Sequence, residues 1–159
     1  MKKNPITILA VDLDHTLIDT DMIVVGLKTI LLNKIYLFPK LIILLLLEGK
    51  QSAKKYLHDN NSISIENLPY NLSTVEFIKN NRRNYNHVIL ISGAYYKYVD
   101  SVANYLELFD SSAGTTLSTN MISHNKINYL KNNFKDFVFD YIGDSKKDIP
   151  IWEQARNAY

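Results

Sequence analysis

The fold is decided by the stretch ITILAVDLDHTL at residues 6–17, where a short apolar run ends on two aspartates. The run Ile6–Val11 is rich in β-branched residues, which predicts a buried strand. Asp12 and Asp14 follow directly, two positions apart. Ligands of open α/β sheets bind beyond the carboxyl ends of the strands, so these two carboxylates are candidate site residues.

Working outward, apolar runs alternate with segments of helical spacing. Further strands are predicted at Val88–Ile91, near Ala113–Leu117, and at Phe137–Ile142. Helices are predicted at Ser73–Arg83 with Ser73 as N-cap, at Tyr95–Leu106, and at Ile127–Phe134. This alternation predicts an α/β fold, a three-layer Rossmann-like parallel sheet with helices on both faces.

The most apolar region, Met22–Leu47, follows the first motif. Lysines interrupt it, so we expect two helices rather than a transmembrane segment. The first runs over about Met22–Ile35; the second has Pro39 in its first turn and ends at Gly49. A helix that is apolar on nearly all of its faces must be covered by another apolar surface. We expect packing within this chain, with a membrane surface or a partner as alternatives.

Composition narrows the class of protein further. The 159 residues are 47% hydrophobic and 21% charged, which excludes a disordered chain. A net charge of +2 without a dense basic patch predicts no nucleic-acid partner. The absence of cysteine excludes disulfides, thiolate metal sites and a cysteine nucleophile. Asp12 and Asp14 stop the first apolar run, so we expect no cleavable signal peptide and a cytoplasmic location.

Polar residues also follow the later strands. Ser92 and Gly93 come after the second strand, where Ser92 is either a helix N-cap or part of an anion site. Asp144 and Asp148 come after the last long strand, where they either satisfy a helix N-terminus or share a cation with Asp12. Close carboxylates repel one another unless a cation or a proton separates them, and Mg²⁺ is the natural oxygen-liganded cation.

Lys126 begins a predicted helix between these segments and alone would be a solvated surface residue. In order along the chain stand an acidic pair, a hydroxyl, a lysine and a second acidic pair. The motifs lie at residues 11–17, 89–93, 126 and 141–148. This arrangement resembles the haloacid dehalogenase-like (HAD) superfamily of phosphotransferases, and the form DLDHTL is similar to its phosphoserine-phosphatase-like members.

The resemblance implies a division of the chain. Residues 1–20 and 71–159 would form the HAD core domain, and residues 21–70 a helical cap inserted after the first strand. The segments 67–71, 108–110 and 148–152 are similar to HAD domains fused ahead of UbiA-type prenyltransferases. A further strand usually follows the last motif's helix, so we expect this chain to lack it and to be the N-terminal part of a longer protein.

The resemblance also assigns roles. Asp12 would be the nucleophile that forms an aspartyl-phosphate, and Asp14 the general acid and base. Mg²⁺ would be the cofactor. Its ligands would be Asp12, the backbone carbonyl of Asp14, and Asp144, with Asp148 orienting them. The residues that would bind the substrate phosphate are Thr16, Ser92, Gly93 and Lys126, with Lys131 as the alternative lysine. His15 would be structural or adjacent to the substrate.

Three functions remain open. The first is hydrolysis of a phosphoprotein, such as one carrying phosphotyrosine, or of an aromatic phosphoester, with Tyr95, Tyr96 and Tyr98 at the mouth of the site. The second is hydrolysis of a lipid or isoprenoid phosphate at a membrane surface, drawn by the apolar cap. The third is a non-catalytic regulatory module of a membrane-associated protein. Independently of these three functions, the cap or a missing C-terminal region is the candidate for a peripheral membrane contact.

Overall fold

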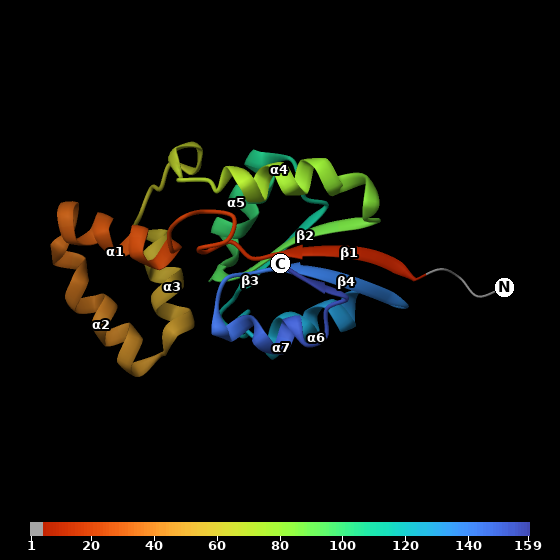
Figure 1. The fold of residues 1–159 in the computed structure, drawn as a ribbon. Coiled ribbons are helices and arrows are strands. Elements are labelled where there is room, and N and C mark those ends of the chain that lie inside the picture. The colour runs from red at the N-terminus through yellow and green to blue at the C-terminus, as the bar shows by residue number, and fades with distance from the viewer. Residues whose placement is uncertain (1–4) are drawn as a thin grey trace.

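The computed structural model describes residues 5–159 and shows one parallel sheet between two layers of helices (Figure 1). The sheet has five strands in the order β3-β2-β1-β4-β5, and every neighbouring pair is parallel. The strands are β1 (Ile6–Val11), β2 (His87–Tyr95), β3 (Ser111–Thr115), β4 (Phe137–Ile142) and β5 (Asn157–Ala158). This confirms the predicted fold class.

Helices cover both faces of the sheet. In Figure 1, α4 and α5 lie over one face, and α6 and α7 lie over the other. The helices are α1 (Met22–Asn33), α2 (Phe38–Leu47), α3 (Lys50–Asp59), α4 (Leu72–Asn81), α5 (Tyr96–Leu106), α6 (His124–Asn133) and α7 (Ile149–Trp152). Short 3₁₀ turns lie at Ile35–Leu37, Ile65–Asn67, Arg82–Asn84 and Lys146–Asp148.

Strand β1 explains why both faces need a cover. Its side chains alternate, so Leu9 and Val11 belong to the core cluster beneath α4 and α5, while Ile8 and Ala10 belong to the cluster beneath α6 and α7. All four side chains are fully buried. A strand that is apolar on both faces therefore becomes the centre of the sheet, and it carries Asp12 and Asp14 to the sheet's carboxyl edge.

Three sequence predictions are corrected. Asn71, rather than Ser73, caps α4, because its side chain accepts hydrogen bonds from the backbone N–H groups of Ser73 and Thr74. Strand β2 continues through Ser92 to Tyr95, so Ser92 is not a helix N-cap. The strand after the last helix, which the sequence analysis expected to be missing, is present as β5, where Asn157 pairs with Asp140 and Ala158 with Tyr141.

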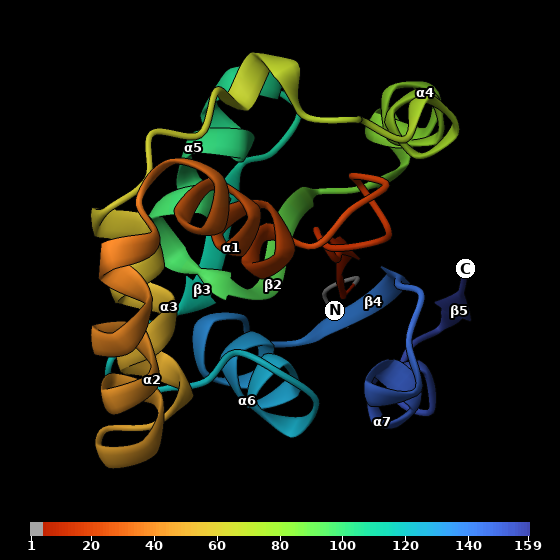
Figure 2. The ribbon, with the colours of Figure 1, turned by 90° about the vertical axis from the view of Figure 1, so that its left-hand side faces the viewer.

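Helices α1, α2 and α3 lie together beyond the carboxyl end of the sheet (Figure 2). They share a small core of Ile30, Leu41, Ala53 and Leu57. The sequence predicted the first two helices but missed α3. Within residues 5–159, no single helix has the length and hydropathy to cross a membrane. Only α1 and the segment 35–47 taken together pass that test, and they are bent by 115°.

Candidate active site

A small pocket of about 110 Å³ at the carboxyl edge of the sheet gathers most of the predicted site residues. Parallel strands all end at this edge, so loops far apart in sequence meet there. The predicted residues that line the pocket are Asp12 and Asp14 after β1, Gly93 from β2, Lys126 from α6, and Asp144 and Asp148 after β4. His15, with a positive φ of 57°, lines it too.

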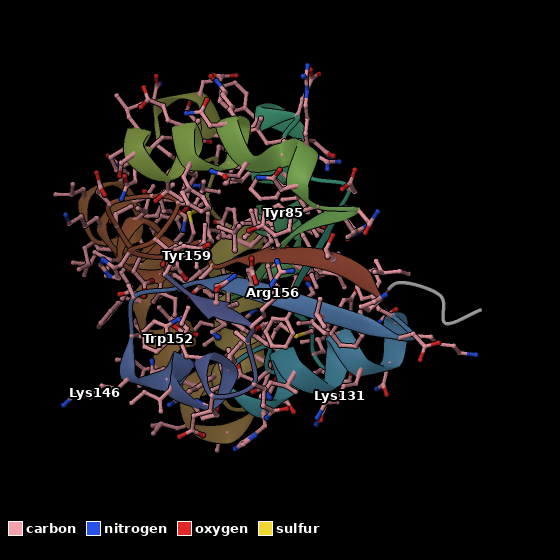
Figure 3. All side chains as sticks on the ribbon, turned by 45° about the vertical axis from the view of Figure 1, so that its right-hand side comes forward. Tyr85, Lys131, Lys146, Trp152, Arg156 and Tyr159 are labelled. Atoms are coloured by element: carbon pink, nitrogen blue, oxygen red, sulfur yellow. The ribbon has the colours of Figure 1, made fainter. Side chains whose placement is uncertain are left out.

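Lys126 is the cation at the centre of this site. Its Nζ atom lies 3.0 Å from Oδ1 of Asp12 and 3.3 Å from Oδ1 of Asp148. The side chain is only 3% exposed, so these charges interact with little screening by water. The alternative, Lys131, instead reaches Gln154 at the outer side of α6, where Figure 3 labels it. Lys126 is therefore the lysine that the fold brings to the aspartates.

Tyr141 is a site residue to which the sequence analysis gave no role. Its buried hydroxyl accepts a hydrogen bond from Lys126 Nζ at 2.6 Å and donates one to Oδ1 of Asp148 at 2.8 Å. Burial and the charges of Asp12 and Asp148 raise the pKa of Tyr141 well above its ordinary value, so the hydroxyl keeps its proton. The one available signal was its place, two positions before Gly143 at the carboxyl end of the last long strand.

The carboxylate of Asp148 is fully occupied by protein donors. Oδ1 contacts Lys126 and Tyr141, and Oδ2 accepts hydrogen bonds from the backbone and hydroxyl of Ser145. Burial raises the pKa of Asp148, but Lys126, Tyr141 and Ser145 outweigh burial and hold it below its ordinary value. A saturated anion of this kind suits an orienting role better than direct metal ligation.

Asp12 and Asp14 have different surroundings. Oδ1 of Asp12 accepts the backbone N–H of Leu13 at 2.8 Å, and burial, opposed by Lys126, raises its pKa. Oδ1 of Asp14 accepts the backbone N–H of Met22 at 2.9 Å, in the first turn of α1. Burial and the neighbouring Asp21 raise the pKa of Asp14 to about 7. Asp14 therefore changes its protonation state near neutral pH.

Carboxylate oxygens of Asp12 and Asp144 are the free donors for a divalent cation, next to the already occupied carboxylate of Asp148. Oxygen atoms of Asp12, Asp144 and Asp148 all lie within 4.8 Å of one another, and Asp144 is exposed. Hard oxygen donors grouped in this way fit Mg²⁺. The side chain of Asp14 is outside this group.

Two predicted residues are placed differently. Ser92 is fully buried, and its Oγ accepts the backbone N–H of Ala94 at 3.1 Å instead of lining the pocket. Thr16 is also buried away from the lining, and its Oγ1 makes no hydrogen bond within residues 5–159. Gly93 does line the pocket, where a β-carbon would lie 2.8 Å from Cγ2 of Ile122. The close approach there requires glycine.

Lys54 links the α1–α3 helices to the pocket and was missed by the sequence analysis. Its Nζ donates hydrogen bonds to the backbone oxygen of Gly93 at 2.6 Å and to Oδ1 of Asn120 at 2.9 Å. Burial lowers the pKa of Lys54, against the attraction of Asp14 and Asp21. No motif marks this lysine, because only the packing of α3 beside the sheet brings it here.

The predicted tyrosine lining is not at this pocket. Tyr95 and Tyr98 are buried against His58 of α3, with ring centroids 5.1 and 4.7 Å from the histidine ring. Tyr96 lines a different pocket of about 510 Å³ beside β3, which holds none of the predicted site residues. Tyr95 and Tyr98 therefore serve mainly to pack α3 against β2 and α5.

Comparisons with known proteins were made by sequence and by fold. No family model matches the chain. The uncharacterized protein y4nM of Sinorhizobium fredii (strain NBRC 101917 / NGR234) is 29% identical over 153 residues. That alignment covers 94% of this chain but only 29% of y4nM, so the chain spans less than a third of this relative.

Solved structures show the fold. A protein from Bordetella pertussis Tohama I, described as of unknown function, has a TM-score of 0.68 at 12% identity, covering 97% of this chain and 89% of that one. A phosphoserine phosphatase with a phospho-aspartyl intermediate analogue has a TM-score of 0.60 at 19% identity, with 98% and 86% covered. A HAD-superfamily hydrolase from Ehrlichia chaffeensis has 0.53 at 22%, with 99% and 87% covered. The chain thus has the fold of HAD-superfamily hydrolases, including phosphoserine phosphatases.

Proposed function

We propose that this chain is a Mg²⁺-dependent phosphomonoesterase that works through an aspartyl-phosphate on Asp12. The observation that carries the proposal is the contact of 3.0 Å between Asp12 and the buried Lys126, in a pocket that also holds Asp14, Asp144 and Asp148. A buried carboxylate beside a fixed cation can receive a phosphoryl group whose charge that cation offsets. The HAD fold supports this assignment.

In the first step, a carboxylate oxygen of Asp12 attacks phosphorus while the bond to the ester oxygen breaks. Asp14 gives its proton to that leaving oxygen, which departs as an alcohol. In the second step, Asp14 takes a proton from water, the water oxygen attacks phosphorus, and the bond to Asp12 breaks to release phosphate. The pKa of Asp14, about 7, suits both transfers because either protonation state is accessible near neutral pH.

Other residues offset charge and fix positions. Lys126 holds the phosphoryl oxygens, and Asp148 and Tyr141 keep its Nζ atom in place. Asp12, the backbone carbonyl of Asp14, and Asp144 would hold Mg²⁺, which neutralises part of the phosphate charge when bound. The hydroxyls of Ser92 and Thr16 contribute only if they turn toward the phosphate, since neither lines the pocket here.

The test uses an activated aryl phosphate, 4-nitrophenyl phosphate, with and without Mg²⁺. Wild-type protein releases nitrophenol only with Mg²⁺, and Asp12→Asn loses at least a thousandfold in kcat because it removes the nucleophile. Asp136→Asn, at an exposed aspartate before β4, is the matched control and keeps wild-type activity. Activity of Asp12→Asn near the wild-type level would reject the nucleophile.

The alternative of a non-catalytic regulatory module gives a different result. Such a module binds Mg²⁺ through its aspartates, yet hydrolyses no phosphoester. The likeness to HAD domains fused to UbiA-type prenyltransferases stays a prediction from sequence. The greater length of y4nM is compatible with further segments in this chain's relatives.

A further inference from the structure

A second pocket, of about 360 Å³, adjoins the candidate active site and is walled by the α1–α3 helices. Ile23 and Leu27 of α1, Leu41 and Leu45 of α2, and Leu57 of α3 form its apolar wall. Its volume is within the range of small-molecule binding sites. Because these helices stand beyond the carboxyl end of the sheet, the pocket opens beside the phosphate-binding end of the molecule.

The two pockets are adjacent and share part of their lining. Ile122 and Lys147 line both of them. Lys54 lines the apolar pocket while its Nζ atom bonds the backbone oxygen of Gly93, which lines the acidic one. A ligand with two unlike ends would therefore place one end in each pocket.

The charged side chains that line the second pocket are all positive. Its lining contains Lys50, Lys54 and Lys147 and no aspartate or glutamate. The remainder is apolar, apart from Asn120. Lysines where the two pockets meet, with apolar side chains beyond them, suit an amphiphile with an anionic head group. A small polar metabolite fits this lining less well.

The outer surface of α2 indicates where such an amphiphile comes from. Ile43, Leu46 and Leu47 are 54%, 76% and 81% exposed, on the faces of α2 that turn away from Leu41 and Leu45. Exposed large apolar side chains gathered on one helix mark an interaction site. It continues over the bend before α2, where Ile35 and Tyr36 are 66% and 74% exposed.

A bilayer fits this surface better than a protein does. The segment 22–47 holds three lysines and no acidic residue. The sequence of α2, FPKLIILLLL, offers no polar side chain other than one lysine, whereas protein interfaces carry a hydrogen-bonding rim. Aliphatic side chains flanked by lysines are the composition of helices that lie in the surface of an anionic bilayer.

We infer that the substrate is a long-chain phosphomonoester taken from a bilayer surface, with its phosphate beside Lys126 and its chain in the apolar pocket. This inference rests on the proposed phosphatase function and names its substrate class. Leu41 and Leu45 face the alkyl chain of the substrate inside the pocket, and the opposite faces of α2 lie in the bilayer. The substrate then passes from membrane to site along one helix.

The preference for a long alkyl chain is tested by comparing butyl phosphate with dodecyl phosphate. Both are dissolved as monomers, and both release a primary alcohol. With Mg²⁺, kcat/KM for dodecyl phosphate is at least tenfold above that for butyl phosphate. Leu45→Glu places a charge in the apolar wall and brings this ratio to near one. Leu72→Glu makes the same change at the exposed start of α4, where Leu72 is 72% exposed, and keeps the wild-type ratio.

The bilayer source is tested with phosphatidylcholine vesicles that contain one-tenth hexadecyl phosphate. Wild-type protein co-sediments with these vesicles and hydrolyses the phosphate in them. The double variant Leu46→Glu and Leu47→Glu loses at least tenfold in both measurements, and Leu72→Glu loses neither. Co-sedimentation of the double variant at the wild-type level would overturn the membrane assignment.

Two failures are distinguishable. Equal kcat/KM for the two dissolved alkyl phosphates, with both activities abolished by Asp12→Asn, would overturn the substrate class and leave the phosphatase function intact. If no phosphoester is hydrolysed, the phosphatase function fails. Binding then decides the inference, because co-sedimentation that depends on hexadecyl phosphate and on Leu45 supports the chain pocket, and its absence overturns it.

Discussion

Nζ of Lys126, a side chain on α6, lies 3.0 Å from Oδ1 of Asp12, the residue that directly follows β1. Both groups are buried, and Asp148 approaches the same Nζ atom at 3.3 Å. One buried cation is thus shared by two buried anions. This arrangement has consequences for stability as well as for chemistry, since removing the cation leaves like charges facing each other.

Lys126→Met is expected to lower the free energy of unfolding by about 3 kcal/mol in EDTA, because two buried carboxylates lose their counter-ion. Added Mg²⁺ restores part of this stability, since a bound cation replaces the missing charge. Urea unfolding with EDTA and with Mg²⁺ measures both effects. Lys131→Met, which removes an exposed lysine, stays near wild type; equal losses in the two variants would contradict the account.

Tyr141→Phe removes the hydroxyl that bridges Lys126 and Asp148. We expect a loss of about 1–2 kcal/mol in unfolding free energy, since hydrogen bonds to charged groups are lost, and a fall in kcat without a matching rise in KM. Tyr129→Phe, on the same helix as Lys126, is the control. A Tyr141→Phe protein with wild-type kcat would show that the hydroxyl does not position the lysine.

Asp140, which lies outside the active site, is expected to make the stability of the fold sensitive to acid. Burial raises the pKa of its carboxyl, but hydrogen bonds from Arg156, Tyr85 and Asn157 outweigh burial and hold it below its ordinary value. Tyr85 and Arg156 are far apart in the sequence, but both bond Asp140, and they lie close together in Figure 3. Stability from this group is present above the unfolded pKa of about 4 and is lost as the pH falls toward the folded pKa.

The variant Asp140→Asn should therefore be less stable than wild type by about 2 kcal/mol at pH 7, where the charge-assisted hydrogen bonds are intact. The difference should shrink steadily as the pH falls below about 4, because the wild-type carboxyl then takes up a proton. Urea midpoints measured between pH 7 and pH 3 test this. A gap that stays constant over that range would mean that Asp140 does not supply the acid-labile stability.

How much of the fold the sequence predicts depends on how local the signal is. Strands β1 and β4 have the predicted bounds, because each is a mostly apolar run, broken only by Thr7 in β1 and by Asp140 in β4. Strand β2 extends past its apolar run, because Ser92 and Gly93 still belong to the strand that pairs with β3. Helix α3 was missed, because only Ala53 and Leu57 are buried in a segment of mostly polar residues.

The site residues also divide into those that a local sequence signal predicts and those that only tertiary packing brings together. Asp12, Asp14, Asp144 and Asp148 follow strands directly, so their meeting at one edge follows from the predicted topology. The contact of Lys126 with Asp12 was implied only by the family resemblance. Lys54 and Tyr141 act through tertiary neighbours, Gly93 in one case and Asp148 in the other, and no local pattern predicts such pairs.

The central claim is that Asp12 carries the phosphoryl group between the two chemical steps. Wild-type protein turning over 4-nitrophenyl phosphate with Mg²⁺ is quenched in acid, digested, and examined by peptide mass spectrometry. We predict that the peptide containing residues 6–17 gains the mass of one phosphoryl group on Asp12, and that Asp12→Asn shows none. Phosphate release by wild-type protein with no phosphorylated Asp12 at any quench time, or with the group on another residue, would contradict the account.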